Sequence, residues 1–572
     1  MKLLLVAINA KYIHSNLAVH SLRAYAKKHG HNEAIALAEY TINHCEEDIL
    51  RGIYKEKADV IAFSCYIWNI EIVLRLVKEL RKVHPEAKLW LGGPEVSYDA
   101  RECMERNPEL EGLMLGEGEQ TFLELTEYYL AGNSSLDQIA GIAYRKGKQV
   151  KLTAPRELLS LSELPFPYEE LADFTNRIIY YESSRGCPFS CSYCLSSVDK
   201  RIRFRDISLV RQELQFLLDR QVPQVKFVDR TFNCNKEHAM AIWSYIKEHD
   251  NGITNFHFEI AADLLDEEEI SFLATLRPAQ IQFEIGVQST NQDTVAAIHR
   301  KMDLNRLKIN VDRVRAGRNI HQHLDLIAGL PLEDYRSFEQ SFSQVYEMAP
   351  DQLQLGFLKV LKGSPMEESC KEYGIVYRDN PPYEVLFTKD LPYEDILKLK
   401  GICDMVEIYY NSGQFANAMG YLKHFYPSPM KLYEELYGHY EKRHMEMQAH
   451  SRMKRYEILL DFFKEQVLNR LEGNPEEIQQ MQELFEEILL MDLFLREDMK
   501  SRPYFATKHS QKNYKALYEE YRKQHKLIHI EEFAYDILAS VTEGKAIKKE
   551  TTVLFNYSDR DPITNSAKIS NL

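Results

Sequence analysis

The stretch RIIYYESSRGCPFSCSYCLSS at residues 177–197 decides how the middle of this chain folds. It opens on a strand-like apolar run and continues into a loop that carries Cys187, Cys191 and Cys194. Thiolates bind structural zinc and iron–sulfur clusters, but zinc sites usually take four ligands, often as two Cys-x-x-Cys pairs. No fourth ligand lies nearby, so the spacing favours an iron–sulfur cluster with one open iron. A zinc site completed by a distant ligand is the alternative.

Length, composition and charge limit the function classes. The 572 residues are enough for about three to four domains, and 45% hydrophobic with 27% charged residues is ordinary for globular proteins. A net charge of −15 argues against bulk nucleic-acid binding. No run of about 18 apolar residues predicts a membrane span. The six other cysteines are too scattered for a disulfide scaffold, and we expect a cytoplasmic protein.

The first 152 residues alternate strand-like and helical stretches. This alternation predicts a Rossmann-like, doubly wound parallel sheet over 1–152, followed by a non-periodic, proline-containing linker at 153–176. The predicted strands are 2–8, 33–38, 59–66, 88–92 and 112–116, the predicted helices are 16–28, 45–57, 70–84 and 119–130, and a hairpin at 141–152 closes the domain.

Ligands of such sheets bind beyond the carboxyl ends of the strands. Those ends hold Ser64 after the third strand and Gly92, Gly93 and Glu95 after the fourth. A Gly-Gly pair lets the backbone approach a ligand, or it makes only a tight turn. The Gly-x-Gly-x-x-Gly fingerprint is missing after the first strand, so a nicotinamide dinucleotide is not the expected ligand.

The cysteine loop resembles the Cys-x-x-x-Cys-x-aromatic-Cys signature of radical SAM enzymes. Tyr193 supplies the aromatic residue, and Arg185-Gly186 and Pro188 match the usual context. The preceding α/β domain resembles the cobalamin-binding domain of the cobalamin-dependent radical SAM subfamily, and the resemblance covers about residues 1–365. It implies a partial (β/α)6 barrel over 177–368. The later barrel strands would lie in 225–233, 256–265, 281–290, 323–334 and 353–365.

The resemblance also implies cofactors and the residues that bind them. The cofactors are a 4Fe–4S cluster on the three cysteines, S-adenosylmethionine (SAM) and cobalamin. Glu259 would approach the ribose or amino acid moiety of SAM, and Glu284 and Asp325 lie in the patterns of the fourth and fifth barrel strands. Arg230 either holds the SAM carboxylate or faces solvent or Asp229. Cobalamin would lie against Ser64, Gly92, Gly93 and Glu95.

The implied reaction is reductive cleavage of SAM to a 5′-deoxyadenosyl radical, followed by methyl transfer to an unactivated carbon. Ring rearrangement, oxidative cyclisation and methylthio transfer are alternatives within the family. A non-catalytic cobalamin or iron–sulfur sensor is the alternative outside it. The partners implied are a small-molecule or peptide substrate and a one-electron donor of the flavodoxin or ferredoxin type.

Two features depart from related patterns. The loop after the first strand contains His14 but not the flanking Asp and Gly of the Asp-x-His-x-x-Gly cobalamin motif, so His14 is either a cobalt ligand or a loop or capping residue. Methylthiotransferases carry a second cluster on three N-terminal cysteines. Here Cys45, Cys65 and Cys103 are better interpreted as core or surface residues.

The last third of the chain carries no motif. Helical spacing at 393–411, 430–470 and 474–499 predicts a mostly α-helical domain over 380–572. The aromatic and histidine-rich stretch 424–447 either contacts substrate or forms an amphipathic core face. The end, 550–572, is either a last strand or a docking tail. The region resembles an uncharacterised helical extension of some family members.

Overall fold

The computed structural model describes the whole chain except residues 133–134, 169–170, 172–173, 175, 472, 500, 507–514 and 524. Two compact units make up the chain. The first comprises Met1–Phe283, Val295–Leu307 and Phe357–Lys389, and the second comprises Glu284–Thr294, Lys308–Gly356 and Asp390–Leu572. Within the described part, no helix is both long and apolar enough to cross a membrane.

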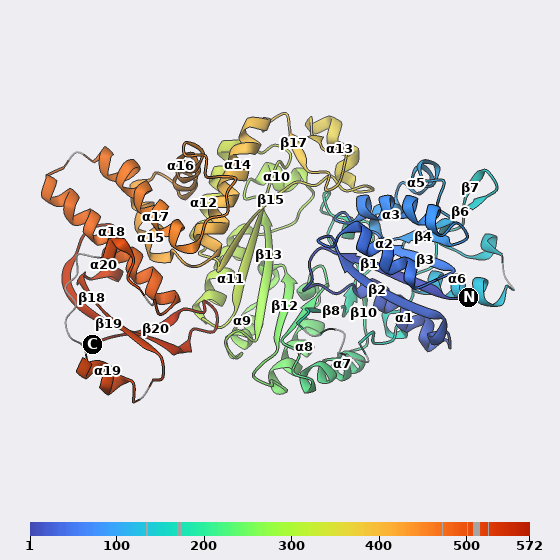
Figure 1. Cartoon of the computed structure of the whole chain (residues 1–572), viewed down its shortest axis with the longest axis horizontal. Coiled ribbons are helices and arrows are strands. Elements are labelled where there is room, and N and C mark those ends of the chain that lie inside the picture. Colours follow the sequence, from blue (N-terminus) through green and yellow to red (C-terminus); the bar gives the residue numbers. More distant parts are fainter. Residues whose placement is uncertain are drawn as a thin grey trace. The chain divides into compact units, whose positions relative to one another are not determined.

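The first unit begins with a seven-stranded sheet in the order β2-β1-β3-β4-β5-β6-β7 (Figure 1). Its first five strands are parallel, and the hairpin β6–β7 adds an antiparallel edge. The strands are β1 (Leu3–Asn9), β2 (Ile35–Thr41), β3 (Val60–Ser64), β4 (Lys88–Gly92), β5 (Gly112–Met114), β6 (Ile142–Lys146) and β7 (Gln149–Leu152).

Helices cover both faces of this sheet because alternate strand residues point to opposite sides. Leu4, Val6 and Ile8 of β1 belong to a core shared with helices on one face, and Leu3 and Leu5 belong to a core on the other. The first face packs against α2 (Glu46–Lys55), α3 (Ile70–Val83) and α5 (Ala100–Arg106), the second against α1 (Leu17–Lys28) and α6 (Glu119–Ala131), and α4 (Pro94–Ser97) follows β4. The Rossmann-like architecture is therefore confirmed.

The segment predicted as a linker, 153–176, is packed rather than free. Leu161 and Leu164 join Tyr25 and Leu123 in a small core. Tyr168 is fully buried, and its hydroxyl donates to the carbonyl of Tyr180 at 2.6 Å. Five residues of this segment, 169–170, 172–173 and 175, lie outside the described part.

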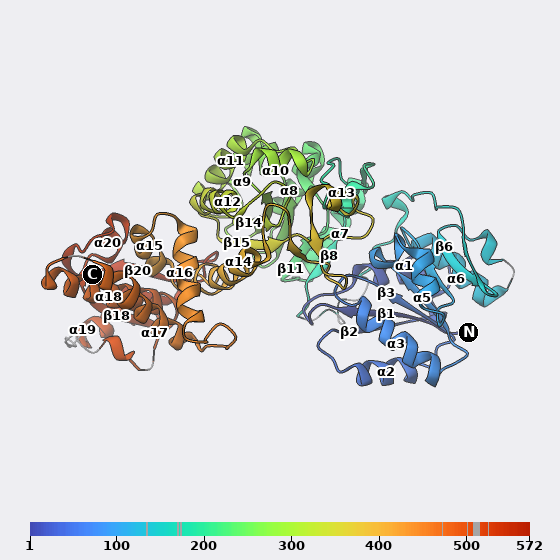
Figure 2. The same ribbon diagram turned by 90° about the horizontal axis from the view of Figure 1, so that it is seen from above.

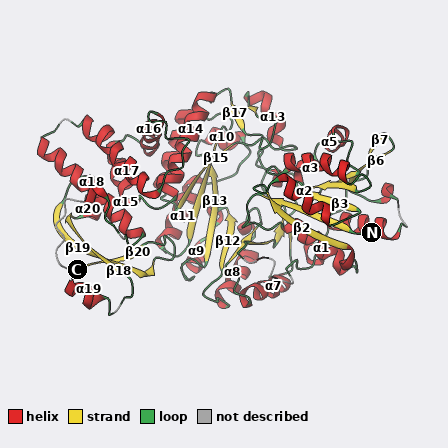
Figure 3. Ribbon diagram, viewed as in Figure 1, coloured by secondary structure: helices red, strands yellow, loops and turns green. Residues whose placement is uncertain are grey.

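The second sheet has six strands in the sequential order β15-β14-β13-β12-β11-β8, as a partial barrel requires. Every predicted barrel strand is present and overlaps its expected stretch, and Figure 3 marks the strands in yellow. The strands are β8 (Ile179–Tyr181), β11 (Gln224–Phe227), β12 (Asn255–Ile260), β13 (Ile281–Gln288), β14 (His321–Ala328) and β15 (Gln352–Phe357), and a short ribbon pairs β9 (Ser184–Arg185) with β10 (Arg203–Phe204).

Helices alternate with these strands along the chain (Figure 2). They are α7 (Ile207–Asp219), α8 (Lys236–Glu248), α9 (Glu267–Leu273), α10 (Gln292–Ala297), α11 (Leu304–Ala316) and α12 (Tyr335–Glu347). After β15 the chain forms α13 (Pro365–Tyr373) and the two-stranded ribbon of β16 (Val376–Tyr377) and β17 (Val385–Phe387), all within the first unit.

The C-terminal part of the second unit is mostly helical, as predicted, but it also contains a sheet. Its helices are α14 (Tyr393–Val406), α15 (Ala416–Leu422), α16 (Pro429–Glu441), α17 (Arg452–Phe462), α18 (Pro475–Arg496), α19 (Lys515–Tyr521) and α20 (Ile537–Glu543). An antiparallel sheet joins β18 (Ile528–Tyr535), β19 (Lys548–Arg560) and β20 (Ala567–Asn571).

One detail of this region differs from the sequence interpretation. Helical spacing at 430–470 suggested a continuous stretch, but residues 442–451 separate α16 from α17. Of the two alternatives for residues 550–572, the last strand holds: Val553 to Phe555 of β19 pair with Ile569 to Asn571 of β20. The core-face interpretation of 424–447 holds for Tyr433, Leu436 and Tyr440, which are buried.

Candidate cofactor site

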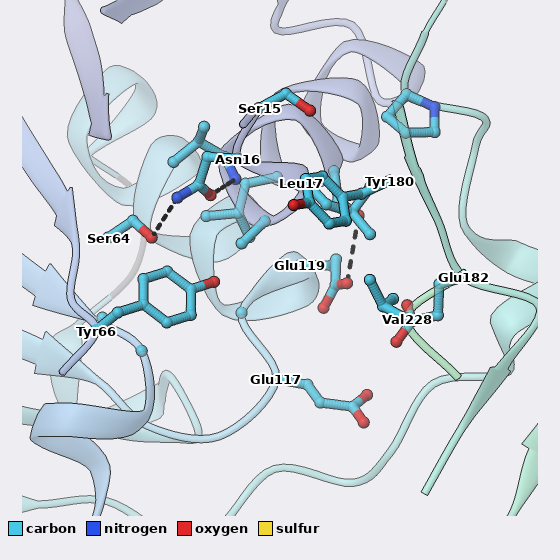
Figure 4. A pocket seen from close by; sticks show the side chains of 18 of the residues that line it. Ser15, Asn16, Leu17, Ser64, Tyr66, Glu117, Glu119, Tyr180, Glu182 and Val228 are labelled. Atoms are coloured by element: carbon cyan, nitrogen blue, oxygen red, sulfur yellow. Dashed lines mark hydrogen bonds between the residues drawn. The ribbon is translucent and has the colours of Figure 1, made fainter. Parts of the chain in front are cut away.

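A cavity of about 720 Å³ lies in the first unit, at the carboxyl ends of the parallel strands (Figure 4). Residues that follow β1, β3 and β4 line one part of it, as expected for a doubly wound sheet. Residues of β8 and residues that follow β11 line another part, so one cavity adjoins both sheets. Lining residues include Asn9, His14, Asn16, Ser64, Tyr66, Trp68, Gly92, Gly93, Tyr98, Glu117, Glu119, Phe166, Tyr168, Tyr180, Glu182, Arg185, Val228 and Arg230.

The Gly92-Gly93 turn forms part of the cavity wall, and only glycine fits its second position. Gly93 has φ +116° and ψ 176°, a region that other residues rarely adopt. A Cβ there would lie 2.4 Å from the carbonyl oxygen of Cys65. Cys65 also donates its N–H to the Gly92 carbonyl at 2.7 Å. The turn therefore lies directly against the neighbouring strand end and keeps backbone, not side chain, at the cavity.

Ser64 is held in the cavity wall by Asn16, which the sequence interpretation missed. The Asn16 amide donates to the Ser64 hydroxyl at 3.2 Å, and its Oδ1 accepts from the N–H of Val19 as the cap of α1 (Figure 4). The position could have been recognised, because asparagine before an apolar-periodic helix is a typical N-cap.

His14 lies in the cavity lining and is oriented by the first barrel strand. The Tyr180 hydroxyl is 2.6 Å from His14 Nδ1. Burial, with smaller effects of Lys11 and Lys226, lowers the pKa of His14 below its usual value, which favours a neutral imidazole. A hydrogen bond at Nδ1 leaves Nε2 as the ring atom able to ligate a metal.

A cluster of carboxylates around one arginine lines another part of the cavity. The Arg185 guanidinium contacts Glu117 at 3.1 Å, Glu119 at 3.0 Å and Glu182 at 2.7 Å. Burial pushes the pKa of Glu119 upward, but Arg185 outweighs this effect and the net pKa is lowered. Glu119 thus stays ionised although it is buried. The cluster ties the start of α6 to the segment that leads into the cysteine loop.

Cys187, Cys191 and Cys194 follow this segment. Cys187 and Cys191 are buried, and Cys194 is partly exposed. Burial raises the pKa of the Cys187 thiol, and the charges of Cys194 and Cys191 act in the same direction. Among the described residues, no three His, Cys, Asp or Glu side chains are placed around a single metal ion. The donor set is that of an iron–sulfur cluster rather than of a completed zinc site.

Side chains from other elements surround these thiols. The Thr231 hydroxyl is 3.8 Å from Cys187 Sγ. Arg300 Nη1 lies 3.7 Å from Cys191 Sγ and donates to the Tyr193 hydroxyl at 3.3 Å. Arg300 therefore places a half-buried cation beside the second cysteine, a contact that the sequence did not indicate.

Two predicted SAM-binding residues lie together. Arg230 Nη1 is 3.8 Å from Glu259 Oε2, and Arg230 also lines the cavity. Asp229 accepts from the Ser183 N–H at 3.0 Å, the Ser183 hydroxyl at 2.6 Å and the Ser184 hydroxyl at 2.5 Å. Arg230 is thus largely exposed and lies near Glu259, whereas Asp229 is buried and accepts from Ser183 and Ser184.

Three other predicted residues lie elsewhere. Glu95 is buried on α4 outside the cavity lining, and it accepts from the Tyr383 hydroxyl at 2.8 Å. Glu284 of β13 belongs to the second unit. So does Asp325 of β14, whose Oδ1 is 3.0 Å from His323 Nε2.

The N-terminal cysteines do not form a second cluster site. Cys65 and Cys103 are buried in the core on one face of the first sheet, whereas Cys45 is exposed at the start of α2. Burial raises the pKa of Cys103 to about 11, so the thiol stays protonated at neutral pH. The interpretation as core and surface residues is confirmed.

Three family models match the chain in succession. Residues 3–126 match the B12 binding domain, residues 181–345 match the Radical SAM superfamily, and residues 371–555 match a protein family of unknown function, DUF4080.

Two curated relatives match about half of this chain. The cobalamin-dependent radical SAM methyltransferase TokK of Streptomyces tokunonensis is 26% identical over 350 residues, which is 55% of this chain and 49% of TokK. The 2-(S-pantetheinyl)-carbapenam-3-carboxylate methyltransferase of Streptantibioticus cattleyicolor is 28% identical over 334 residues, or 50% of this chain and 45% of that protein. This chain thus spans about half the length of these relatives.

A solved structure shares the fold. The cobalamin-dependent S-adenosylmethionine radical enzyme OxsB, with aqua-cobalamin and S-adenosylmethionine bound, superposes with a TM-score of 0.58 at 16% identity, covering 86% of this chain and 80% of OxsB. The matched domains are those that handle cobalamin and, at a 4Fe–4S cluster, S-adenosylmethionine. The chain therefore belongs to the radical SAM enzymes that carry a cobalamin-binding domain ahead of the barrel.

Proposed function

We propose that this protein is a cobalamin-dependent radical SAM methyltransferase that acts on an unactivated carbon of a small molecule or peptide. One observation carries the proposal: a single cavity is lined both by the carboxyl ends of β1, β3 and β4 and by residues of β8 and residues that follow β11. A cofactor bound against the first sheet there lies next to the barrel strand that leads into the cysteine loop. TokK and the carbapenam enzyme are both methyltransferases, which supports this class of reaction.

The residues fit the cofactors in chemistry. Gly92 and Gly93 offer the bare backbone that a large flat cofactor needs at close approach, and Ser64 and Asn16 offer polar groups beside it. Cys187, Cys191 and Cys194 supply the three thiolates of a cluster. We propose that SAM is bound by Arg230, Glu259, Glu284 and Asp325. Glu95 is proposed to support the Gly92-Gly93 turn through its bond to Tyr383.

When bound, SAM at the reduced cluster supplies a 5′-deoxyadenosyl radical and cobalamin supplies the methyl group. The protein has to position these groups and exclude water. The apolar and aromatic lining, including Leu5, Phe63 and Phe166, excludes water from one side of the cavity. The Tyr180–His14 hydrogen bond fixes the imidazole ring. The Arg230–Glu259 pair keeps a cation and a carboxylate at the ends of β11 and β12.

The cluster requires an external one-electron donor, which we propose to be a flavodoxin or ferredoxin. All nine cysteines are free thiols, which agrees with a reducing compartment, and we propose the cytoplasm.

Anaerobic reconstitution tests this function. The protein is loaded with iron, sulfide and hydroxocobalamin, reduced, and assayed for bound cobalamin and for 5′-deoxyadenosine. Wild type should bind cobalamin and cleave SAM. Cys191→Ala should lose cluster iron and SAM cleavage but keep cobalamin, whereas Cys45→Ala, at an exposed thiol, should behave as wild type. Full SAM cleavage by Cys191→Ala would reject the cluster assignment, and a wild type without bound cobalamin would reject methyl transfer.

A further inference from the structure

We infer that residues 357–389, here called the brace, fix the cysteine loop at a set position relative to the turn that bounds the cavity. The brace follows β15 and contains α13, drawn in yellow in Figure 1, with β16 and β17. It contacts both loops, and all three segments belong to the first unit. The positioning role rests on the proposed function, because it gives the two loops their ligands.

One end of the brace binds the helices after the Gly92-Gly93 turn. The Tyr383 hydroxyl donates to Glu95 Oε2 of α4 at 2.8 Å, in a buried setting. Lys362 Nζ donates to Asp99 Oδ2, at the start of α5, at 2.8 Å. Because α4 begins directly after Gly93, these two bonds fix the direction in which the chain leaves the turn.

Between these bonds the brace packs closely on a cavity residue. Gly363 has φ +75°, and a Cβ there would lie 2.1 Å from Cδ1 of the Tyr98 ring. Tyr98 itself lines the cavity. The glycine is therefore required for the brace to lie against Tyr98, and a larger residue would push that ring.

The other end of the brace holds the cysteine loop. The N–H of Met366, in the first turn of α13, donates to the carbonyl of Ser192 at 2.9 Å. Ser192 stands between Cys191 and Tyr193, and its own N–H donates to the carbonyl of Ile298 at 2.9 Å. The middle of the loop is thus bonded on both sides, and one of these bonds comes from the brace.

Internal hydrogen bonds connect the two ends. Val360 N–H donates to the Tyr383 carbonyl at 3.0 Å, and Val385 N–H donates to the Leu358 carbonyl at 2.8 Å. An antiparallel bridge joins Lys359 to Glu384 between them. This pairing places Tyr383 beside the segment that runs through Lys362 and Gly363 to α13. A displacement at Glu95 therefore also moves Met366.

The hydrogen bond between Tyr383 and Glu95 is buried, which makes the contact between the brace and α4 rigid. Burial raises the pKa of Glu95, which the Tyr383 hydroxyl bond and Lys362 oppose. Removing the hydroxyl leaves a buried carboxyl short of a partner, and such a loss costs more than the bond itself. The match to the family of unknown function begins at residue 371, so it includes Tyr383 of the brace.

Hydrogen–deuterium exchange on the reconstituted full-length protein tests the brace. In the double variant Tyr383→Phe/Lys362→Met, amides of 93–106 and of 187–194 should both exchange about tenfold faster. The dissociation constant for hydroxocobalamin should rise roughly tenfold. Lys371→Met, at an exposed lysine of α13, is the matched control and should change neither. Gly363→Ala provides a second perturbation at Tyr98, should the double variant fold poorly.

Faster exchange confined to 93–106, with 187–194 unchanged, would overturn the brace as a link between the two loops. Exchange rates unchanged from wild type in both segments would overturn it entirely. A wild type that binds no hydroxocobalamin would instead reject the cobalamin function, and the exchange data would still decide whether the brace connects the loops.

Discussion

The Gly93→Ala variant tests whether the backbone turn forms the cofactor surface. Gly93 has φ +116° and ψ 176°, and placing a non-glycine residue there costs about 1–3 kcal/mol. The added Cβ would also lie 2.4 Å from the Cys65 carbonyl oxygen, against an ordinary contact of 3.4–4 Å. Moving backbone by about 1 Å to relieve such overpacking costs about 1–3 kcal/mol more.

The sum, about 2–6 kcal/mol, should lower the unfolding temperature by roughly 4–20 °C. The assay is thermal unfolding followed by circular dichroism, with a hydroxocobalamin titration below the transition. Cobalamin affinity should fall by at least about tenfold, because the shifted turn changes the cavity wall.

Gly132→Ala is the matched control for Gly93→Ala. Gly132 also has a positive φ, +66°, but open space surrounds its Cβ position, so only about 1 kcal/mol of backbone strain is expected. Its position at the end of α6 is outside the cavity lining, and cobalamin affinity should not change. If Gly93→Ala unfolded at the wild-type temperature and bound cobalamin with wild-type affinity, the proposed role of the turn would be refuted.

Two further predictions concern charges. Arg300→Met should lower the reduction potential of the cluster by on the order of tens of millivolts in an EPR-monitored redox titration, because a cation near Cys191 favours the added electron. Lys301→Met, at an exposed lysine, is the control. An unchanged potential in Arg300→Met would contradict this role. Burial raises the pKa of Asp492 to about 7. Because this pKa is higher in the folded than in the unfolded protein, the contribution of Asp492 to stability is full below about pH 4 and is lost as the pH rises towards 7. The free energy of unfolding of Asp492→Asn, measured with denaturant, should therefore depend less on pH than that of wild type. Parallel curves for the two proteins would exclude Asp492 as the source.

Periodicity predicted the first sheet well because its strands are buried on both faces. Residues 3–9 form β1 as one buried run, and the helices after it begin within a residue or so of their predicted starts. The cysteine loop and the order of the barrel strands were also predictable, since the strand motifs are spaced along the chain as the fold requires.

Contacts between segments distant in sequence were not predictable. Glu95 was expected beside the cofactor because it follows the Gly-Gly turn, but α4 turns its side chain to Tyr383, which lies 288 positions later. Tyr168 lies in a non-periodic segment with several prolines, so nothing local indicated that it is buried. The strand at Ile528–Tyr535 was missed although its burial alternates along most of its length, a period-two signal that could have been recognised.

The arginine before the cysteine loop constrains how this protein can be recombined with its relatives. Arg185 bonds Glu117 and Glu119 of the N-terminal domain as well as Glu182 at the end of β8. A chimera that exchanges only the N-terminal domain would leave a half-buried guanidinium facing foreign side chains, unless the donor carries both carboxylates. Functional crossovers should therefore transfer residues 116–119 and 182–185 as one module, and the linker between them offers no neutral junction.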